Sequence, residues 1–337
     1  MELPRSSVLK NTAKHRLENA GETGKIVLIY TGILTAVSAI ATVAQYALGK
    51  GISQTGGLQN MGLRSVLGTV SSLLPVVQVL MILCLGLGFT AAMLRTARGQ
   101  YTSPRTLKAG VERFWVLLRC SLLQGMIYLG IGIGSVYLTI LIFTLTPLSD
   151  AAVERLMPLL TASGKSLGEL PKIDAAMEDA MLEALGPMVP VILLIFLGIF
   201  LALSLPLMYR YRMADYLLVD RPGIGALAAL RESRFLMQGN RLRLFRLDLS
   251  FWWFYALSML ATVICYGDVL MQIFGIPLPF SADAGYFLFY GAYLAVNFAI
   301  YYFFVARVEC TYAAAYDALA PRQQPQQGAV LGNIFQM

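Results

Sequence analysis

The sequence predicts an all-α, polytopic membrane protein with six transmembrane helices and cytoplasmic amphipathic helices. The first observation is composition: 57% of the 337 residues are apolar and only 13% are charged, against a charged share of about 25% in soluble domains. The second is the length of the apolar runs, six of which can cross a hydrocarbon core about 30 Å thick. The third is the uneven distribution of lysine and arginine among the loops.

Each apolar run is about 20 residues or longer, the length that a helix needs to span a bilayer while satisfying its own backbone hydrogen bonds. We expect the spans at residues 26–48, 65–94, 120–145, 187–209, 249–266 and 286–305. The fifth run is the shortest, and its opening residues, Phe251 to Tyr255, are typical of the aromatic belt at a membrane interface. The first run is too long for the core of a signal peptide, so we expect it to span.

Lysines and arginines lie mostly on one side of this predicted bundle. The N-terminal arm, the second and fourth connections and the C-terminal segment hold 21 of the 26 cations, and the opposite side holds 5. Positively charged loops remain in the cytoplasm. We therefore expect a multi-pass protein of the plasma membrane with both termini cytoplasmic.

The chain divides into three parts by charge and hydropathy. Residues 1–24 form a basic amphipathic cytoplasmic arm, residues 25–320 the six-span membrane domain, and residues 321–337 a polar cytoplasmic tail that we expect to be disordered. Within the membrane domain, residues 149–186 form an acidic extracellular loop and residues 210–248 a basic cytoplasmic loop. The role of the acidic loop stays open between a solvated decoration and a lid over a binding site.

Helix signals occur in the acidic loop at about residues 152–160 and 171–185. Basic amphipathic stretches also precede each pair of spans, at about residues 7–17, 106–118 and 224–237. Two interpretations stay open for these stretches: a repeat of three helical hairpins, or the basic connectors that any polytopic protein carries.

Few side chains are suited to metal or covalent chemistry. The single histidine, His15, lies in the polar arm, and the four cysteines are scattered without a CxxC pair. The sequence also lacks a nucleotide-binding loop and a paired base for an intramembrane nucleophile. We expect no cofactor, no metal site and no catalytic residue. We assign the net charge of +7 to contact with anionic membrane lipid rather than with nucleic acid.

Cations that flank the spans are candidates for contact with lipid headgroups. Arg241, Arg243 and Arg246 alternate with Leu and Phe just before the fifth run, and Arg95 and Arg98 follow the second run. Each cation near an anionic leaflet contributes about 1 kcal/mol of attraction. The alternative, that these arginines serve only as topology anchors, stays open.

Two carboxylates, Asp248 and Glu309, lie at the predicted membrane boundary. A carboxylate in this position needs a partner. For Asp248 the candidates are Arg243, Arg246 or a helix N-terminus, in which case Asp248 is the N-cap of the fifth span.

One face of the sixth run carries polar side chains at helical spacing. The set comprises Tyr286, Tyr290, Tyr293, Asn297 and Tyr301. An amide without a hydrogen bond costs several kcal/mol in the membrane interior, so we expect this face to point into the bundle, with Gln78 and Gln124 as candidate partners of Asn297. Interhelical hydrogen bonding and the lining of a polar cavity both stay open.

Four stretches of the sequence resemble one known family. They are VLKNTAKHRLENAGETGKIVL, LGFTAAMLRTARGQ with LKAGVERF, ESRFLMQGNRLRLFRLDLSFWWFYAL and TYAAAYDAL. The third is the most specific, since Gly239, Arg243, Phe245 and the LDLSF segment that begins at Leu247 follow the family's pattern. These stretches are similar to Domain of Unknown Function 975, a family of Firmicute integral membrane proteins. The resemblance implies a bacterial multi-span membrane protein without an assigned activity, and the acidic loop departs from the pattern.

The missing catalytic groups and the polar face together favour a non-catalytic protein, an accessory or transport-type module for a lipid, peptide or other amphipathic cargo. The expected partners are anionic membrane lipids and a membrane or cytoplasmic protein. One alternative is a membrane scaffold or regulatory subunit that recruits a protein through its basic face. Another is an enzyme that acts on lipid headgroups with Asp248, Glu309 and the arginines.

Overall fold

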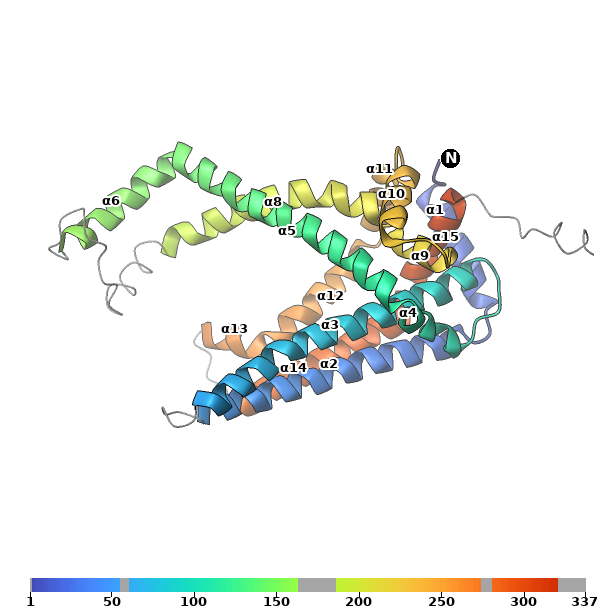
Figure 1. The fold of residues 1–337 in the computed structure, drawn as a ribbon, viewed down its shortest axis with the longest axis horizontal. Coiled ribbons are helices and arrows are strands. Elements are labelled where there is room, and N and C mark those ends of the chain that lie inside the picture. Colours follow the sequence, from blue (N-terminus) through green and yellow to red (C-terminus); the bar gives the residue numbers. More distant parts are fainter. Residues whose placement is uncertain (1, 55–60, 163–185, 274–280, 321–337) are drawn as a thin grey trace, which may run out of the picture. The chain divides into compact units, whose positions relative to one another are not determined.

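The computed structural model describes residues 2–54, 61–162, 186–273 and 281–320 (Figure 1). Within these residues every regular element is a helix, which confirms the all-α prediction. Five helical segments are long and apolar enough to cross a membrane, and a bent pair of helices forms a sixth candidate. The chain is therefore a multi-pass membrane protein by the length and composition of its helices.

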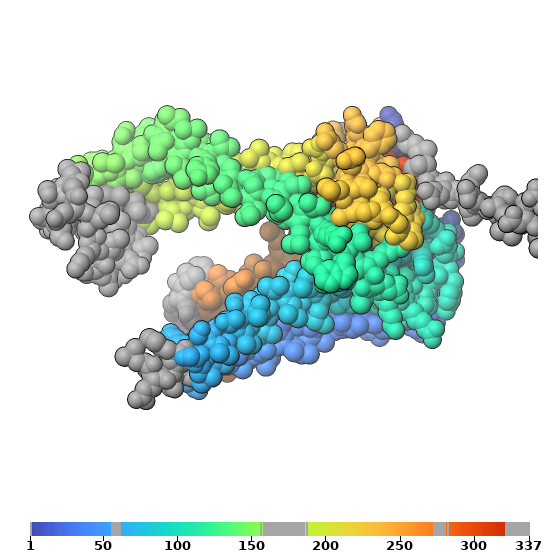
Figure 2. Space-filling model, in the orientation of Figure 1, coloured from blue at the N-terminus to red at the C-terminus, as the bar shows by residue number. Residues whose placement is uncertain are grey.

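The chain forms two compact units, which are described separately. Unit 1 comprises Met1–Cys120 and Arg210–Met337, and unit 2 comprises Ser121–Tyr209. In unit 1, α2 (Thr23–Gln54) packs along α3 (Met61–Ala97), and α14 (Ala282–Ile300) lies beside α2 (Figure 1). Figure 2 shows the side chains of α2 and α3 in continuous contact. The first and second predicted spans lie within α2 and α3, and the sixth begins in α14.

The fifth predicted span, at residues 249–266, corresponds to a short helix that bends sharply away from the helix before it. The helix α11 (Arg241–Leu249) meets α12 (Trp252–Cys265) at an angle of 60°, and α13 (Gly267–Ile273) follows. The 14 residues of α12 extend only about 21 Å, which is shorter than the hydrocarbon core. The predicted N-cap role of Asp248 is wrong, because Asp248 lies inside α11 and the residue that precedes α12 is Phe251.

The sixth predicted span continues well beyond its expected end. A π-helical turn, η4 (Tyr301–Val305), joins α14 to α15 (Ala306–Leu319), so that one helical segment runs from Asp283 to Leu319. The π-turn accommodates one extra residue without interrupting the helix.

Short helices occupy the three basic amphipathic stretches that the sequence indicates. They are α1 (Ser6–Glu18), η2 (Pro104–Lys108) with α4 (Ala109–Glu112), and α10 (Ala226–Leu236), and a further short helix is α9 (Ala214–Asp220). Together with α11 and α15 they gather at one end of unit 1, which we call the basic end (Figure 1).

Two glycines allow the η2–α4 segment to lie directly on α3. A Cβ atom at Gly110 would overlap the carbonyl oxygen of Cys84, and a Cβ atom at Gly88 would overlap that of Leu107. Because both neighbours are backbone atoms, neither can move aside as a flexible side chain would. The close approach fixes one side of the basic end.

Unit 2 contains most of α5 (Phe114–Leu145), then α6 (Pro147–Ala162), η3 (Gly186–Met188) and nearly all of α8 (Val189–Tyr211). The helix predicted at residues 152–160 lies within α6 and is confirmed. The helix predicted at 171–185 and the tail at 321–337 lie outside the described residues.

Candidate functional site

The helix α15 is the centre of the basic end. Much of it is buried, and Cys310, Tyr312 and Tyr316 are fully enclosed. Three consecutive alanines, beginning at Ala313, leave room for α1 and α3, which both pack against α15. The two tyrosines and two acidic residues of the same helix bring polar atoms into this tightly packed environment, where each needs a hydrogen-bond partner.

One group of these polar atoms surrounds Arg98, directly after α3. Its Nε atom donates to Oδ1 of Asp317 at 2.9 Å, and a terminal nitrogen donates to Oδ1 of Asp220. The hydroxyl of Tyr316 donates to the second oxygen of Asp220 at 2.9 Å. The three charged side chains are between 12 and 23% exposed, so this ion pair is largely shielded from water and joins α3, α9 and α15.

The end of α3 places Arg98 through its backbone. Gly99 has φ +72°, its N–H donates to the Thr96 carbonyl, and the Gln100 N–H donates to the Arg95 carbonyl, each at 2.9 Å. This pattern is a Schellman C-cap, which favours glycine because of the positive φ. The hydrogen bond to Asp220 raises the pKa of the Arg98 guanidinium and outweighs burial, which lowers it.

A second group of polar atoms continues along α15. The hydroxyl of Tyr216 donates to Oε2 of Glu309 at 3.0 Å, and the ring of Tyr216 stacks on that of Tyr316 with centroids 5.5 Å apart. Tyr312 donates its hydroxyl hydrogen to Asp248 and lies 3.1 Å from the hydroxyl of Tyr255. These contacts connect α15 with α9, α11 and α12.

Arg212 lies among these tyrosines and carboxylates. Its guanidinium is 4.8 Å from the ring centroid of Tyr312, a cation–π arrangement. The charges of Glu309 and Asp248 also act on this cation. We call the whole set the α15 polar cluster, and its members are Arg98, Arg212, Tyr216, Asp220, Asp248, Tyr255, Glu309, Tyr312, Tyr316 and Asp317.

Both predicted boundary carboxylates belong to the α15 polar cluster. The hydroxyl groups of Tyr312 and Tyr216 donate to Asp248 and Glu309, respectively. These tyrosines, together with Arg212 and Asp220, are not among the site residues predicted from the sequence. A signal was present, because positions 309, 312 and 316 share one helical face directly after an apolar run. Across the residues that the structure covers, no group of His, Cys, Asp and Glu is arranged to hold a metal ion.

The predicted headgroup arginines occupy different environments. Arg95 and Arg246 are exposed, whereas Arg98 is held by the two aspartates described above. Arg241 is half-buried, and its Nε atom has no hydrogen-bond partner within the described part of the chain. Arg243 contacts the N-terminal arm through the Leu3 carbonyl and the Glu2 carboxylate. Contact of these arginines with lipid stays a prediction.

The predicted polar face of the sixth run contacts α2 near its beginning. The hydroxyl of Tyr290 donates to the Ser38 carbonyl at 3.1 Å and accepts from Thr42 at 2.7 Å. Tyr286 stacks on Tyr46, with ring centroids 5.6 Å apart. These contacts fit interhelical hydrogen bonding, whereas a cavity along this face stays a prediction.

The remaining members of that predicted set lie further along the chain or in the other unit. Tyr293 and Asn297 are half-buried on α14, and Tyr301 lies near the ring of Phe254. Among the residues the structure describes, none forms a hydrogen bond with the Asn297 side chain. Gln78 is half-buried on α3. Gln124 belongs to unit 2, so its predicted pairing with Asn297 stays a prediction.

Comparison with known protein families gives a match over nearly the whole chain. A family described as "Protein of unknown function (DUF975)" matches residues 3–319. The chain belongs to the DUF975 family. The match confirms the resemblance noted in the sequence, and it includes every member of the α15 polar cluster. Neither a curated protein nor a solved structure matches this DUF975 chain.

Proposed function

We propose that this DUF975 protein is a non-catalytic protein of the plasma membrane that serves as an accessory or transport-type module for an amphipathic cargo with an anionic group. The observation that carries this proposal is the surface of α10 and α11. These helices expose arginines and large apolar side chains next to one another, which is the pattern of an interfacial helix that contacts both headgroups and acyl chains.

On α10 the apolar side chains of Leu227 and Phe235 are 66 and 74% exposed, and Arg231 and Arg234 lie between them in the sequence and are exposed. On α11 the side chain of Leu242 is 60% exposed, and Arg246 follows one turn later. In water such apolar exposure is costly. At a membrane surface the same residues gain contact with lipid while the arginines attract anionic groups.

The α15 polar cluster supports the proposal by holding α11 in place, and α10 packs against α9, which the cluster also holds. Its hydrogen bonds and ion pairs connect α9, α11 and α12 to the buried α15. A binding surface on helices that are fixed to one another loses less entropy on binding than one on flexible loops. The cluster's carboxylates are already paired with tyrosine hydroxyls or a guanidinium, so their role in this proposal is structural.

The experiment uses the full chain in nanodiscs made from a mixture of phosphatidylcholine and phosphatidylglycerol. Native mass spectrometry then identifies the lipids that stay bound to the protein. We expect phosphatidylglycerol to be enriched over its share of the mixture, and the enrichment to fall as salt rises. Bound lipid that mirrors the bulk mixture at low salt would contradict the proposal. Stoichiometric recovery of a second protein would support the scaffold alternative instead.

The cytoplasmic location of the basic end belongs to the same proposal, and it is supported by the distribution of cations. Single cysteines are introduced at Ser163 and Gln326, and intact cells are treated with an impermeant thiol reagent. We expect labelling at position 163 and protection at position 326. The reverse pattern would invert the topology and move the basic end to the outer leaflet.

A further inference from the structure

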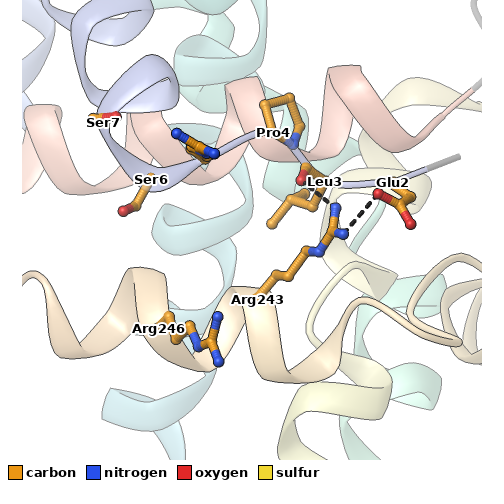
Figure 3. A pocket seen from close by; sticks show the side chains of 8 residues that line it. Glu2, Leu3, Pro4, Ser6, Ser7, Arg243 and Arg246 are labelled. Atoms are coloured by element: carbon orange, nitrogen blue, oxygen red, sulfur yellow. Dashed lines mark hydrogen bonds and ion pairs between the residues drawn. The ribbon is translucent and has the colours of Figure 1, made fainter.

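A pocket of about 780 Å³ lies between the N-terminal arm and α11 (Figure 3). Its volume is within the range of about 300–1,000 Å³ that is usual for small-molecule sites. Three arginines line it, Arg5 from the arm and Arg243 and Arg246 from α11, together with Glu2 and the serines that begin α1. The pocket therefore combines three cations with one carboxylate.

The walls of this pocket are fixed by contacts between distant parts of the chain. The N–H of Leu3 donates to Oδ1 of the buried Asn240 at 2.9 Å, and the Leu3 carbonyl accepts from Arg243 at 2.9 Å. Further along α1, the ammonium of Lys10 donates to the Ser250 carbonyl at 2.8 Å. The arm is thus attached to both ends of α11, and the three arginines face a pocket of defined shape.

The charge of the pocket is only partly balanced. Glu2 accepts a hydrogen bond from Arg243 at 2.6 Å, yet its side chain is 82% exposed, so an exposed carboxylate holds this guanidinium. Arg5 and Arg246 are exposed and form no ion pair with any residue in the described ranges. The first turn of α1 has no side-chain cap, and Ser6 and Ser7 at its start line the same wall.

We propose that this pocket binds a phosphate-bearing anion, and that Glu2 occupies part of the site until the anion displaces it. Guanidinium groups bind phosphate oxygens through paired hydrogen bonds, which a single exposed carboxylate cannot match. The inference rests on the proposed function and deepens it, because a phospholipid headgroup is one source of this chemistry. Free inorganic phosphate is the other source.

The test compares two double variants that remove equal charge from the pocket or from a site elsewhere in unit 1. The pocket variant is Arg5→Gln with Arg246→Gln, and the matched control is Arg105→Gln with Arg119→Gln, which alters exposed arginines outside both the pocket and the α10–α11 surface. Arg243 is left intact because its contact with Leu3 holds the arm. The full chain in detergent is titrated with short-chain phosphatidylglycerol and, separately, with inorganic phosphate.

We expect the pocket variant to bind short-chain phosphatidylglycerol about tenfold more weakly or worse, since it loses two charge-assisted contacts. The control variant should stay within about twofold of the wild type. Glu2→Gln should bind more tightly, because the competing carboxylate is gone. If inorganic phosphate binds with the same dependence on the variants, the ligand class is free phosphate, whereas binding of the lipid alone assigns a headgroup.

Equal losses of affinity in the pocket and control variants would overturn the proposed binding site and indicate binding by a general basic surface instead. In that case the nanodisc enrichment of anionic lipid persists, and the proposed function stands. If enrichment is absent but inorganic phosphate still binds through Arg5 and Arg246, the proposed function fails and the pocket stands. Absence of any binding to the wild type by either probe would reject the pocket.

Discussion

Replacing Arg98 with alanine is the sharpest test of the α15 polar cluster. The change leaves Asp220 and Asp317 without their cation while their side chains are only 20 and 12% exposed. Removing one partner of a buried ion pair costs about 3–5 kcal/mol. Partial exposure and the remaining hydrogen bond from Tyr316 to Asp220 reduce this cost, so we expect a loss of about 2–3 kcal/mol in the free energy of unfolding.

The assay follows thermal unfolding through the thiol of Cys310, which is fully buried in α15. Cys84, Cys120 and Cys265 are first replaced by alanine, so that a thiol-reactive dye reports on α15 alone. Heating the detergent-solubilised protein then exposes the thiol when the helix separates from α1 and α3. We expect the Arg98→Ala variant to react at a temperature lower by roughly 5–10 °C.

Two further variants calibrate the measurement. Lys14→Ala breaks the Lys14–Glu18 pair, whose side chains are 65 and 62% exposed, so its cost should be below about 0.5 kcal/mol. Arg98→Lys keeps the charge but lacks the planar guanidinium group that contacts both aspartates, so the midpoint of its thermal unfolding should be intermediate. If Arg98→Ala shifted the midpoint no more than Lys14→Ala does, the reasoning about a shielded ion pair would be refuted.

Two pairs of variants test the packing of unit 1 in the same assay. Gly110→Ala places a Cβ on the Cys84 carbonyl and should clearly lower the midpoint of thermal unfolding. The control Gly86→Ala, whose Cβ meets no atom within 4 Å, should leave the midpoint unchanged. Similar midpoints for the two variants would contradict the close approach of α4 to α3. Tyr290→Phe removes two hydrogen bonds to α2 and should lower the free energy of unfolding by about 0.6–2 kcal/mol. Tyr293→Phe, the control, should cost less. Equal costs would show that the Tyr290 hydroxyl does not stabilise the packing of α14 on α2.

Span positions could be predicted well from the sequence, because lipid imposes one length and one polarity on every crossing helix. The break near Ser250 could not be predicted in this way. Hydropathy rises there, from the arginine-rich α11 to the apolar α12, but a change in hydropathy does not give an angle. The structure shows α11 held to the N-terminal arm by contacts of Leu3 and Lys10. Contacts between residues some 240 positions apart leave no mark in a local hydropathy window.

The residues of the candidate site could likewise be predicted only in part from the sequence. Asp248 and Glu309 could be selected from the sequence because a carboxylate at a membrane boundary is costly without a partner. Their partners could not be predicted, because the arginines nearby in the sequence are not the partners that the structure shows. Tyrosines from other helices donate the hydrogen bonds. The sequence predicts Arg98 only as a cation near lipid, because the two aspartates that hold it come from much later in the chain.

The π-turn η4 determines the rotational phase of α15 relative to α14. Each residue of an α-helix advances the side-chain direction by about 100°, so the extra residue accommodated at Tyr301–Val305 sets which face of α15 turns toward α9 and α11. Without it, Tyr312 and Tyr316 would point about a quarter-turn away from Asp248 and Asp220. The number of residues in this segment therefore determines which face of α15 meets α9 and α11. Deletion of one residue here should be more damaging than most substitutions.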